Sequence, residues 1–305
     1  MHDNRLLLRL MSNVSAAILV RSLDADLVAR SAEAGSAPAK ASNTVRAYAS
    51  DLARFEDWCQ GYGLCSLPAR EDTIRTYLVS LADEGLKHST VARAYAAIRS
   101  QHASAGARLP TLISVTNFLK SLGRAIGVAP QRAEPLMASA LKLAASEASP
   151  RDAAMLLVGF AAALRRSEIV ALNVSDVRFT EDGAIVTIRR SKTDQAGAGR
   201  EVAIPHGQAV RALRAWLAGK TTGAIFTDAK GCRLAPQAVA RIVKKTVGAE
   251  YSGHSLRAGL ATSAAKAGKS LASIMKTTGH KSERVAMTYI RHGSLFDDCA
   301  SEGLL

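Results

Sequence analysis

The sequence predicts a mainly α-helical protein with one small antiparallel β-sheet, which is the α+β class. Apolar residues recur at three- and four-residue steps through most of the chain, the spacing that places them on one face of a helix. Only near the middle do two short β-branched runs flank a glycine-rich segment, which predicts a hairpin. At 305 residues the chain is long enough for two hydrophobic cores, since single domains mostly run to about 100 to 200 residues.

Four helices are predicted in the first half of the chain. An apolar stripe over 45–55 follows Ser42-Asn43-Thr44, a group of good N-cap residues, so the first helix is expected to begin near Thr44. Three more stripes of the same spacing follow at 74–81, 91–98 and 112–122. Together these helices would make a small all-α module.

A linker is predicted where the composition changes. The segment from Gly123 to Pro135 contains two glycines, two prolines and two arginines, and this composition is typical of a connection between domains. We therefore expect a helical domain over 36–123, a linker over 124–135 with the boundary near Arg132, and a second domain over 136–305 that ends in a tail. Residues 1–35 form an N-terminal extension to which the sequence assigns no role.

The second half combines helices with the predicted hairpin. The apolar run 153–164 predicts a buried helix, because it is shorter than the roughly 18 residues that a membrane span needs. Strands are predicted over 184–188, after the turn Asp182-Gly183, and over 201–204, before Pro205, with a loop from Ser191 to Gly199. Further helices are expected over 210–217 and 237–247.

The charge favours a polyanionic partner. Forty lysines and arginines against 26 acidic residues leave a net charge of +14. Residues 1–132 contribute +5 of this excess and residues 133–305 contribute +9, so both halves could face nucleic acid. The alternative is a basic surface that is simply solvated.

Cysteine usage and the N-terminus bear on the compartment. The four cysteines show no Cys-x-x-Cys spacing and no neighbouring histidines, which argues against a zinc site or a disulfide framework. No long apolar segment with a cleavage site follows the initial methionine. We expect a cytoplasmic, nucleoid-associated protein without membrane contact.

The chemistry of the chain is concentrated in a few polar residues. His254-Ser255-Leu256-Arg257 precedes Gly279-His280, and Tyr289 follows nine residues after that histidine. With Arg165 and Lys192 upstream, the set holds two guanidiniums, two imidazoles, an ammonium and a phenol. A phenol has a pKa of about 10, so to attack a phosphodiester it needs an adjacent base and fixed positive charge around the phosphate. This set suits phosphoryl transfer without a metal.

These motifs, in this order, resemble those of the tyrosine recombinases of the phage integrase type, nearer to the Cre-like and bacterial integrase members than to the topoisomerases. The resemblance runs from about Ser42 to the end and is strongest in the last third. It implies that Arg165 is the first catalytic arginine and that Glu168 supports Arg165 or His254. It also assigns the remaining catalytic roles to the hairpin lysine, the His-x-x-Arg pair, the second histidine and the nucleophile, which are Lys192, His254, Arg257, His280 and Tyr289.

The same resemblance implies the architecture and the reaction. A helical core-binding domain and a catalytic domain would form a C-shaped clamp around double-stranded DNA. Tyr289 would attack the scissile phosphate and form a 3′-phosphotyrosyl bond, without any cofactor. Exchange between two duplexes implies a homodimer on each site and a homotetramer in the synapse, with accessory DNA-bending proteins as further partners.

Residues that contact DNA are predicted at one helix start and along two basic helix faces. A helix N-terminus with hydroxyls and cations can hold a phosphate, although a capped, solvated helix has the same composition. The predicted DNA-binding residues are Lys87, Ser89, Thr90, Arg93, Arg99, Arg132, Arg241, Lys244 and Lys245.

Other functions remain open on the sequence alone. A type IB topoisomerase would use the same chemistry to relax DNA with little sequence preference. A non-catalytic DNA-binding protein would need none of these residues. The tail, which contains Leu295 and Phe296, could dock on a neighbouring subunit or fold back on its own domain.

Overall fold

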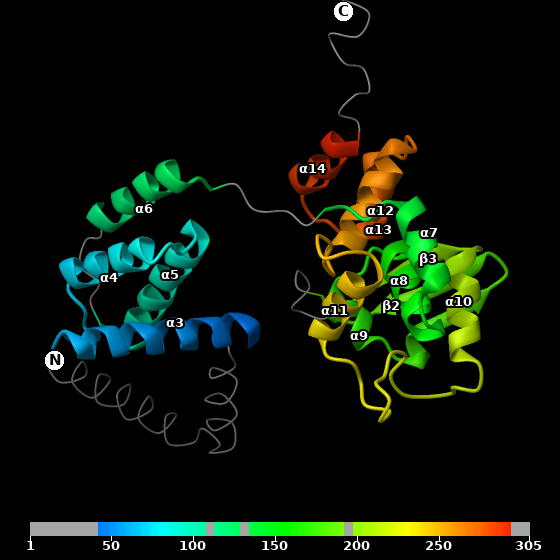
Figure 1. Ribbon diagram of the computed structural model, residues 1–305, viewed down its shortest axis with the longest axis horizontal. Helices are drawn as coiled ribbons and strands as arrows, with labels where there is room; N and C mark the ends of the chain where they lie inside the picture. The colour runs from blue at the N-terminus through cyan, green and yellow to red at the C-terminus, as the bar shows by residue number, and fades with distance from the viewer. Residues whose placement is uncertain (1–41, 108–112, 129–133, 192–197, 294–305) are drawn as a thin grey trace, which may run out of the picture. The chain divides into compact units, whose positions relative to one another are not determined.

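The computed structural model describes residues 42–107, 113–128, 134–191 and 198–293, and it divides the chain into two compact units, Met1–Ala129 and Pro130–Leu305. Each unit is described by itself (Figure 1). The extension 1–35, Arg132 in the predicted linker, Lys192 and the tail lie outside the described residues. No helix within the described ranges is both long and apolar enough to cross a bilayer.

The first unit contains the four predicted helices. They are α3 (Ser42–Gly61), α4 (Glu71–Asp83), α5 (His88–Ser104) and α6 (Ile113–Ile126). α5 packs against α3, α4 and α6, and the apolar stripes meet in a core that includes Phe55, Tyr77 and Ile98. α6 continues past Gly123, so the first three residues of the predicted linker are helical.

The second unit contains a three-stranded antiparallel sheet in the order β1-β2-β3. Its strands are β1 (Val177–Thr180), β2 (Gly183–Ile188) and β3 (Arg200–Pro205). The β2–β3 pair confirms the predicted hairpin, with Val186 opposite Val202. β1 was not predicted, because four residues that include an arginine and a threonine are too few to show an alternating pattern.

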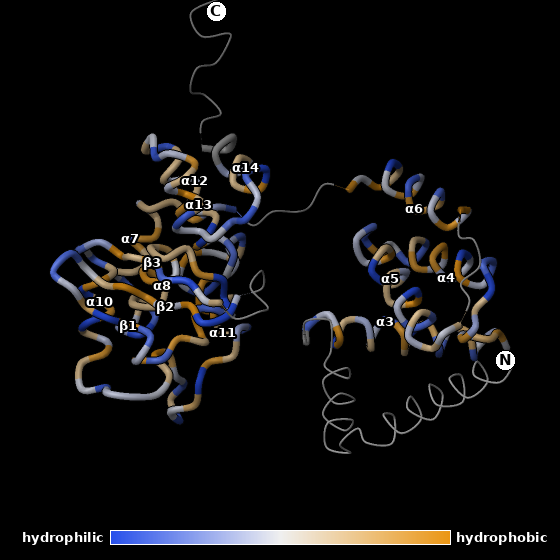
Figure 2. The backbone as a smooth tube through the Cα atoms, turned by 180° about the vertical axis from the view of Figure 1, so that it is seen from behind, coloured by the Kyte–Doolittle hydropathy of each residue, from blue (hydrophilic) through white to orange (hydrophobic). Residues whose placement is uncertain are grey.

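The helices of this unit pack around α8 (Figures 1 and 2). α8 (Pro150–Ala161) contacts α7 (Ala138–Glu147), α10 (Gln208–Leu217) and α12 (Ser255–Lys266). Met155, Leu156 and Val158 of α8 are fully buried, which confirms the predicted buried helix. The remaining helical elements are α9 (Arg166–Ala171), the short 3-10 turn η1 (Val174–Asp176), α11 (Pro236–Thr246), α13 (Leu271–Thr278) and α14 (Glu283–Gly293).

α12 is held closely against the segment that enters the second unit. Leu136 is fully buried, and its N–H donates a hydrogen bond to the carbonyl of Ser255 at 3.0 Å. A Cβ atom built on Gly259 would lie 1.9 Å from the Leu136 carbonyl oxygen. Only a glycine therefore permits this approach, and it fixes the first turn of α12.

We expect Gly259→Ala to lower the free energy of unfolding by about 2 kcal/mol, because backbone must move to relieve the overlap and overpacking costs of this kind run to about 1–3 kcal/mol. Thermal melting monitored by circular dichroism measures the effect. Gly61→Ala is the control, since a Cβ atom there meets nothing within 4 Å. A Gly259→Ala protein that melts like wild type would contradict this account of the helix contact.

Candidate active site

The start of α12 places Arg257 inside the second unit. Its side chain is 1% exposed, and its Nη1 donates a hydrogen bond to the carbonyl of Ala163 at 2.8 Å. Ala163 has a φ of +50°, a left-handed conformation that is uncommon for a residue other than glycine. This turn ends α8 at Ala161, three residues earlier than the apolar run 153–164 suggested, and presents the carbonyl that orients Arg257.

One donor of Arg257 is left without a partner. Its Nη2 is buried and makes no hydrogen bond within the described part of the chain. Burial lowers the pKa of Arg257 to about 10, with the nearby charge of Arg165 as the next cause, while Glu168 and Tyr289 act in the opposite direction. The guanidinium therefore stays charged at neutral pH. An unsatisfied buried donor calls for an explanation, and an anionic oxygen of a bound molecule would supply the missing acceptor.

Arg165 is fixed by Glu168. The Nη1 of Arg165 lies 2.6 Å from Oε1 of Glu168, and the Arg165 backbone N–H donates to Oε2 at 3.0 Å. Glu168 is only 2% exposed, so the pair is held inside the protein at the start of α9. Of the two partners proposed for Glu168 from the sequence, the structure shows Arg165.

Tyr289 contacts both predicted catalytic histidines, His254 and His280. Its helix, α14, packs against α12 and α13. The Tyr289 hydroxyl and Nε2 of His254 are 2.9 Å apart, which is hydrogen-bonding distance. The His280 ring stacks on the Tyr289 ring with centroids 5.5 Å apart and an angle of 16° between the planes. A phenol, a base within reach of its proton and a second imidazole thus meet at one place.

The local electrostatics keep both imidazoles neutral. Although His254 reaches the surface, partial loss of solvent lowers its pKa, followed by the charges of Arg257 and Arg165. The pKa of His280 falls to about 4, first through burial and then through nearby cationic groups, of which Arg257 and Arg165 matter most. His280 is also held by its Nδ1, which lies 2.9 Å from the hydroxyl of the fully buried Thr278.

The sequence did not predict a third arginine, Arg200, that lies beside these groups. It is the first residue of β3, its Nη1 donates to the carbonyl of Thr277 at 2.8 Å, and its Nη2 lies 3.8 Å from Glu168. A cavity of about 310 Å³ next to it is lined by Ile188, Ser191, Ala198, Gly199, Arg200, Gly279, His280 and Lys281. No motif marks Arg200, and its position one residue after the glycine-rich loop is the only signal in the sequence.

The predicted DNA-binding residues of the first unit lie on α5 and at its N-cap. Lys87, Ser89 and Arg99 are exposed, while Thr90 is half-buried. Arg93 is also exposed, but its guanidinium forks onto Asp51 of α3 with distances of 2.8 and 3.0 Å. The fork stabilises helix packing in the first unit, so Arg93 has a structural partner that the sequence did not reveal.

The predicted DNA-binding residues of the second unit lie on α11. Arg241, Lys244 and Lys245 are exposed, whereas Val239 and Val243 on the same helix are fully buried. The helix therefore presents a basic face outward, as the sequence indicated. Whether DNA lies against that face is a proposal that depends on the function of the site.

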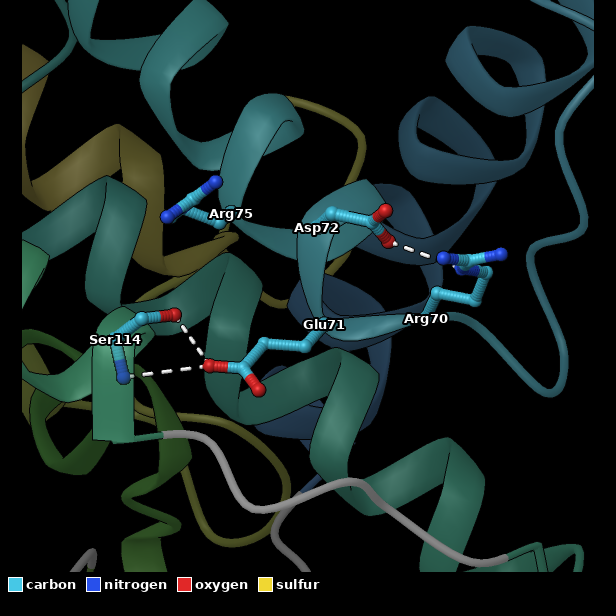
Figure 3. A pocket seen from close by; sticks show the side chains of 5 residues that line it. All are labelled: Arg70, Glu71, Asp72, Arg75 and Ser114. Atoms are coloured by element: carbon cyan, nitrogen blue, oxygen red, sulfur yellow. Dashed lines mark hydrogen bonds and ion pairs between the residues drawn. The ribbon is translucent and has the colours of Figure 1, made fainter.

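A separate hollow in the first unit has a different character (Figure 3). Glu71 accepts hydrogen bonds from the backbone N–H and hydroxyl of Ser114, and Asp72 forms an ion pair with Arg70 at 3.3 Å. The Glu71 carboxylate thus joins the starts of α4 and α6, whereas Asp72 pairs with the residue that precedes its own helix. Within the described residues, no group of three or more histidine, cysteine or acidic side chains is arranged to hold a metal ion.

Comparisons with known proteins agree with this geometry. The chain matches the family described as "Phage integrase family" over residues 128–294, and "Phage integrase, N-terminal SAM-like domain" over residues 36–108. It is 38% identical over 290 residues to an integrase/recombinase xerD homolog of Selenomonas ruminantium, with 86% of this chain and 85% of the relative covered.

Solved structures share the fold. A post-cleavage complex of the XerH site-specific recombinase with a palindromic difH substrate matches with a TM-score of 0.63 at 16% identity, covering 83% of this chain and 76% of that one. A lambda integrase dimer bound to a COC′ core site matches with a TM-score of 0.60 at 18% identity, covering 86% and 93%. The mostly helical fold with its small sheet, the order of the motifs and the matched families lead to one conclusion: the chain belongs to the phage integrase family of tyrosine recombinases.

Proposed function

We propose that this protein is a site-specific DNA recombinase that cuts and rejoins strands through a 3′-phosphotyrosyl intermediate. The observation that carries the proposal is the 2.9 Å contact between the Tyr289 hydroxyl and His254. This contact lies in a site where the positive charges of Arg165 and Arg257 help to lower the pKa of both histidines. A tyrosine with a base at its hydroxyl and fixed cations nearby is equipped to attack an anionic phosphodiester.

Arg165 and Arg257 bind the scissile phosphate in this proposal. The two contacts between Glu168 and Arg165 fix one guanidinium, and the Ala163 carbonyl fixes the other. The unpartnered Nη2 of Arg257 donates to a non-bridging oxygen when substrate is bound. Donors that are already oriented stabilise the charge of the transition state without rearrangement, which makes them effective catalysts.

The bond changes then follow from the contacts. The Tyr289 oxygen attacks phosphorus while its proton passes to Nε2 of His254, and the bond from phosphorus to the 5′ oxygen breaks. The family resemblance assigns protonation of that 5′ oxygen to Lys192, and His280 donates a hydrogen bond to the phosphate. A 5′ hydroxyl of another strand reverses the step, because the phosphotyrosyl bond retains the energy of the original phosphodiester.

The lowered pKa of His254 predicts how cleavage depends on pH. A base must be unprotonated to accept the tyrosine proton, and a pKa below the ordinary 6.5 keeps His254 neutral at pH 7. We expect the single-turnover cleavage rate to be insensitive to the state of His254 at about pH 6.5 and above, and to fall only as the pH drops through this lowered pKa. His254→Gln should be slower at pH 7 by about 10²–10⁴-fold and lose that acid limb. An unchanged acid limb in this variant would assign it to another group.

Recognition of DNA is proposed to involve both units. Exposed Lys87 and Arg99 at and along α5, with Arg241, Lys244 and Lys245 of α11, offer cations to phosphates, and exposed Ser89 offers a hydroxyl. Thr90, Arg93 and Arg132 complete the predicted set. The XerH and lambda integrase matches are complexes with DNA, and the latter is a dimer. By analogy we propose a clamp of both units around the duplex, a dimer on each site and a tetramer in the synapse, with accessory DNA-bending proteins as optional partners.

A covalent trapping experiment tests the function. Wild-type protein is incubated with a randomised duplex library in which each molecule carries a nick, so that cleavage beside the nick releases a short strand and prevents religation. We expect a protein–DNA adduct, mapped by mass spectrometry to the peptide that contains Tyr289, and a shared sequence among the trapped molecules. Absence of any adduct contradicts the proposed function.

The same material separates recombination from simple relaxation of DNA. Two plasmids that carry the trapped sequence should yield recombinant products, and plasmids without it should remain supercoiled. Relaxation of plasmids that lack the sequence would instead assign the chain to topoisomerase chemistry.

A further inference from the structure

Arg200 joins three parts of the site that are far apart in the sequence. It begins β3 directly after the glycine-rich loop, and its side chain is 21% exposed. Its Nη1 donates to the Thr277 carbonyl in the last turn of α13, the helix that leads to His280. A Cβ atom on Gly279 would lie 2.8 Å from the Arg200 Nε, so the guanidinium lies directly against the left-handed turn before His280.

The opposite end of the same guanidinium faces the Arg165–Glu168 pair. Its Nη2 lies 3.8 Å from Oε2 of Glu168, the oxygen that accepts the backbone N–H of Arg165. Glu168 is therefore shared by two arginines. Arg200 thus touches the turn of His280 on one side and the partner of Arg165 on the other.

This arrangement is costly for folding alone. The Nη2 of Arg200 is buried and makes no hydrogen bond to any residue that the structure describes; among these residues it has only the long ion pair with Glu168. Burial lowers the pKa of Arg200, and the positive charge of Arg165 adds to that effect. An under-satisfied cation placed near Arg165 and Arg257 destabilises the fold, and a cost of this kind is typically retained at functional sites.

We propose that Arg200 is a positioning residue for catalysis, which sets the Arg165–Glu168 pair and the Gly279–His280 turn in the mutual geometry needed to grip one phosphate. Because its Nη1 is bonded to Thr277 and its Nη2 is buried beside Glu168, Arg200 acts through these neighbours. The inference rests on the proposed function, since it concerns the same reaction. Small displacements of a catalytic group matter here, because a shift of about 1 Å can cost about 10²-fold in rate.

Arg200→Lys tests the inference with little change in charge or volume. Lysine retains the cation but, as a point donor, cannot span Thr277 and Glu168 together. On a nicked substrate of the trapped sequence, we expect single-turnover cleavage to fall by about 10- to 100-fold while DNA affinity stays within about twofold. Arg178→Lys is the control and should cleave like wild type, since Arg178 is the exposed residue of the otherwise half-buried β1.

A second substrate separates positioning from a general structural role. In a methylphosphonate a neutral methyl group replaces one charged oxygen of the scissile phosphate, so less charge must be stabilised by guanidiniums. If Arg200 acts through Arg165, the deficits of Arg165→Ala and Arg200→Lys should both shrink on this substrate. An equal Arg200→Lys deficit on both substrates, a cleavage rate within about threefold of wild type, or a parallel loss of DNA affinity would each overturn the inference. Failure of wild type to form any adduct would instead reject the proposed function.

Discussion

Tyr289→Phe should abolish formation of the covalent adduct, with a loss of at least about 10⁴-fold, because removing the nucleophile of a covalent mechanism costs that much or more. The phenylalanine ring preserves the stacking on His280, so the site should stay folded. The lost contact is the hydrogen bond between the hydroxyl and His254. DNA affinity, measured by gel shift, should therefore remain within about twofold of wild type, since that hydroxyl bonds to His254 and not to the basic helix faces.

The matched control is Tyr251→Phe, which removes a phenol from a half-buried residue packed on the core of the same unit. It should form the adduct at the wild-type rate. An adduct that persists in Tyr289→Phe and maps to another residue would mean that the nucleophile is misassigned. An equal loss in both variants would point to damage of the fold and not of the chemistry.

The helices could be predicted from sequence because their signal is local. Each apolar stripe, such as that of Phe55 or Ile98, reports burial with a period that a short window reveals. The residues at which helices end were harder to predict from the sequence. α8 ends at Ala161 because Ala163 adopts a left-handed conformation, and that conformation is stabilised by its carbonyl contact with Arg257, a residue far away in the chain.

The same distinction applies to the site. His254, Arg257, His280 and Tyr289 belong to compact motifs, so their resemblance to a family was visible, and the structure brings all four together. Arg200 was missed because its meaning lies in contacts across the fold and not in neighbouring residues. The fork of Arg93 onto Asp51 escaped prediction for the same reason, since the two residues lie on different helices.

Arg257→Lys is expected to have the second largest effect. One guanidinium nitrogen holds the Ala163 carbonyl, and the other is buried without a partner and is the proposed phosphate donor. Lysine can supply only one of these interactions, so cleavage should fall by about 10²–10³-fold, as for the loss of one preoriented donor to a developing charge. Single-turnover cleavage of the trapped sequence measures the effect, and thermal melting checks that the variant is folded.

The control is Arg284→Lys on α14, an exposed arginine near the nucleophile in sequence, which should cleave normally. Cleavage by Arg257→Lys at the wild-type rate would show that charge alone suffices and that the fork of Arg257 is unimportant.

A mixture of the Arg257→Lys and Tyr289→Phe proteins tests whether the tyrosine attacks within its own subunit. Since Tyr289 contacts His254 of its own chain, attack within one subunit predicts that the mixture cleaves no faster than Arg257→Lys alone. Recovery of adduct in the mixture would mean that the tyrosine is delivered to the site of a neighbouring subunit, and that the contact seen in the single chain is a resting arrangement.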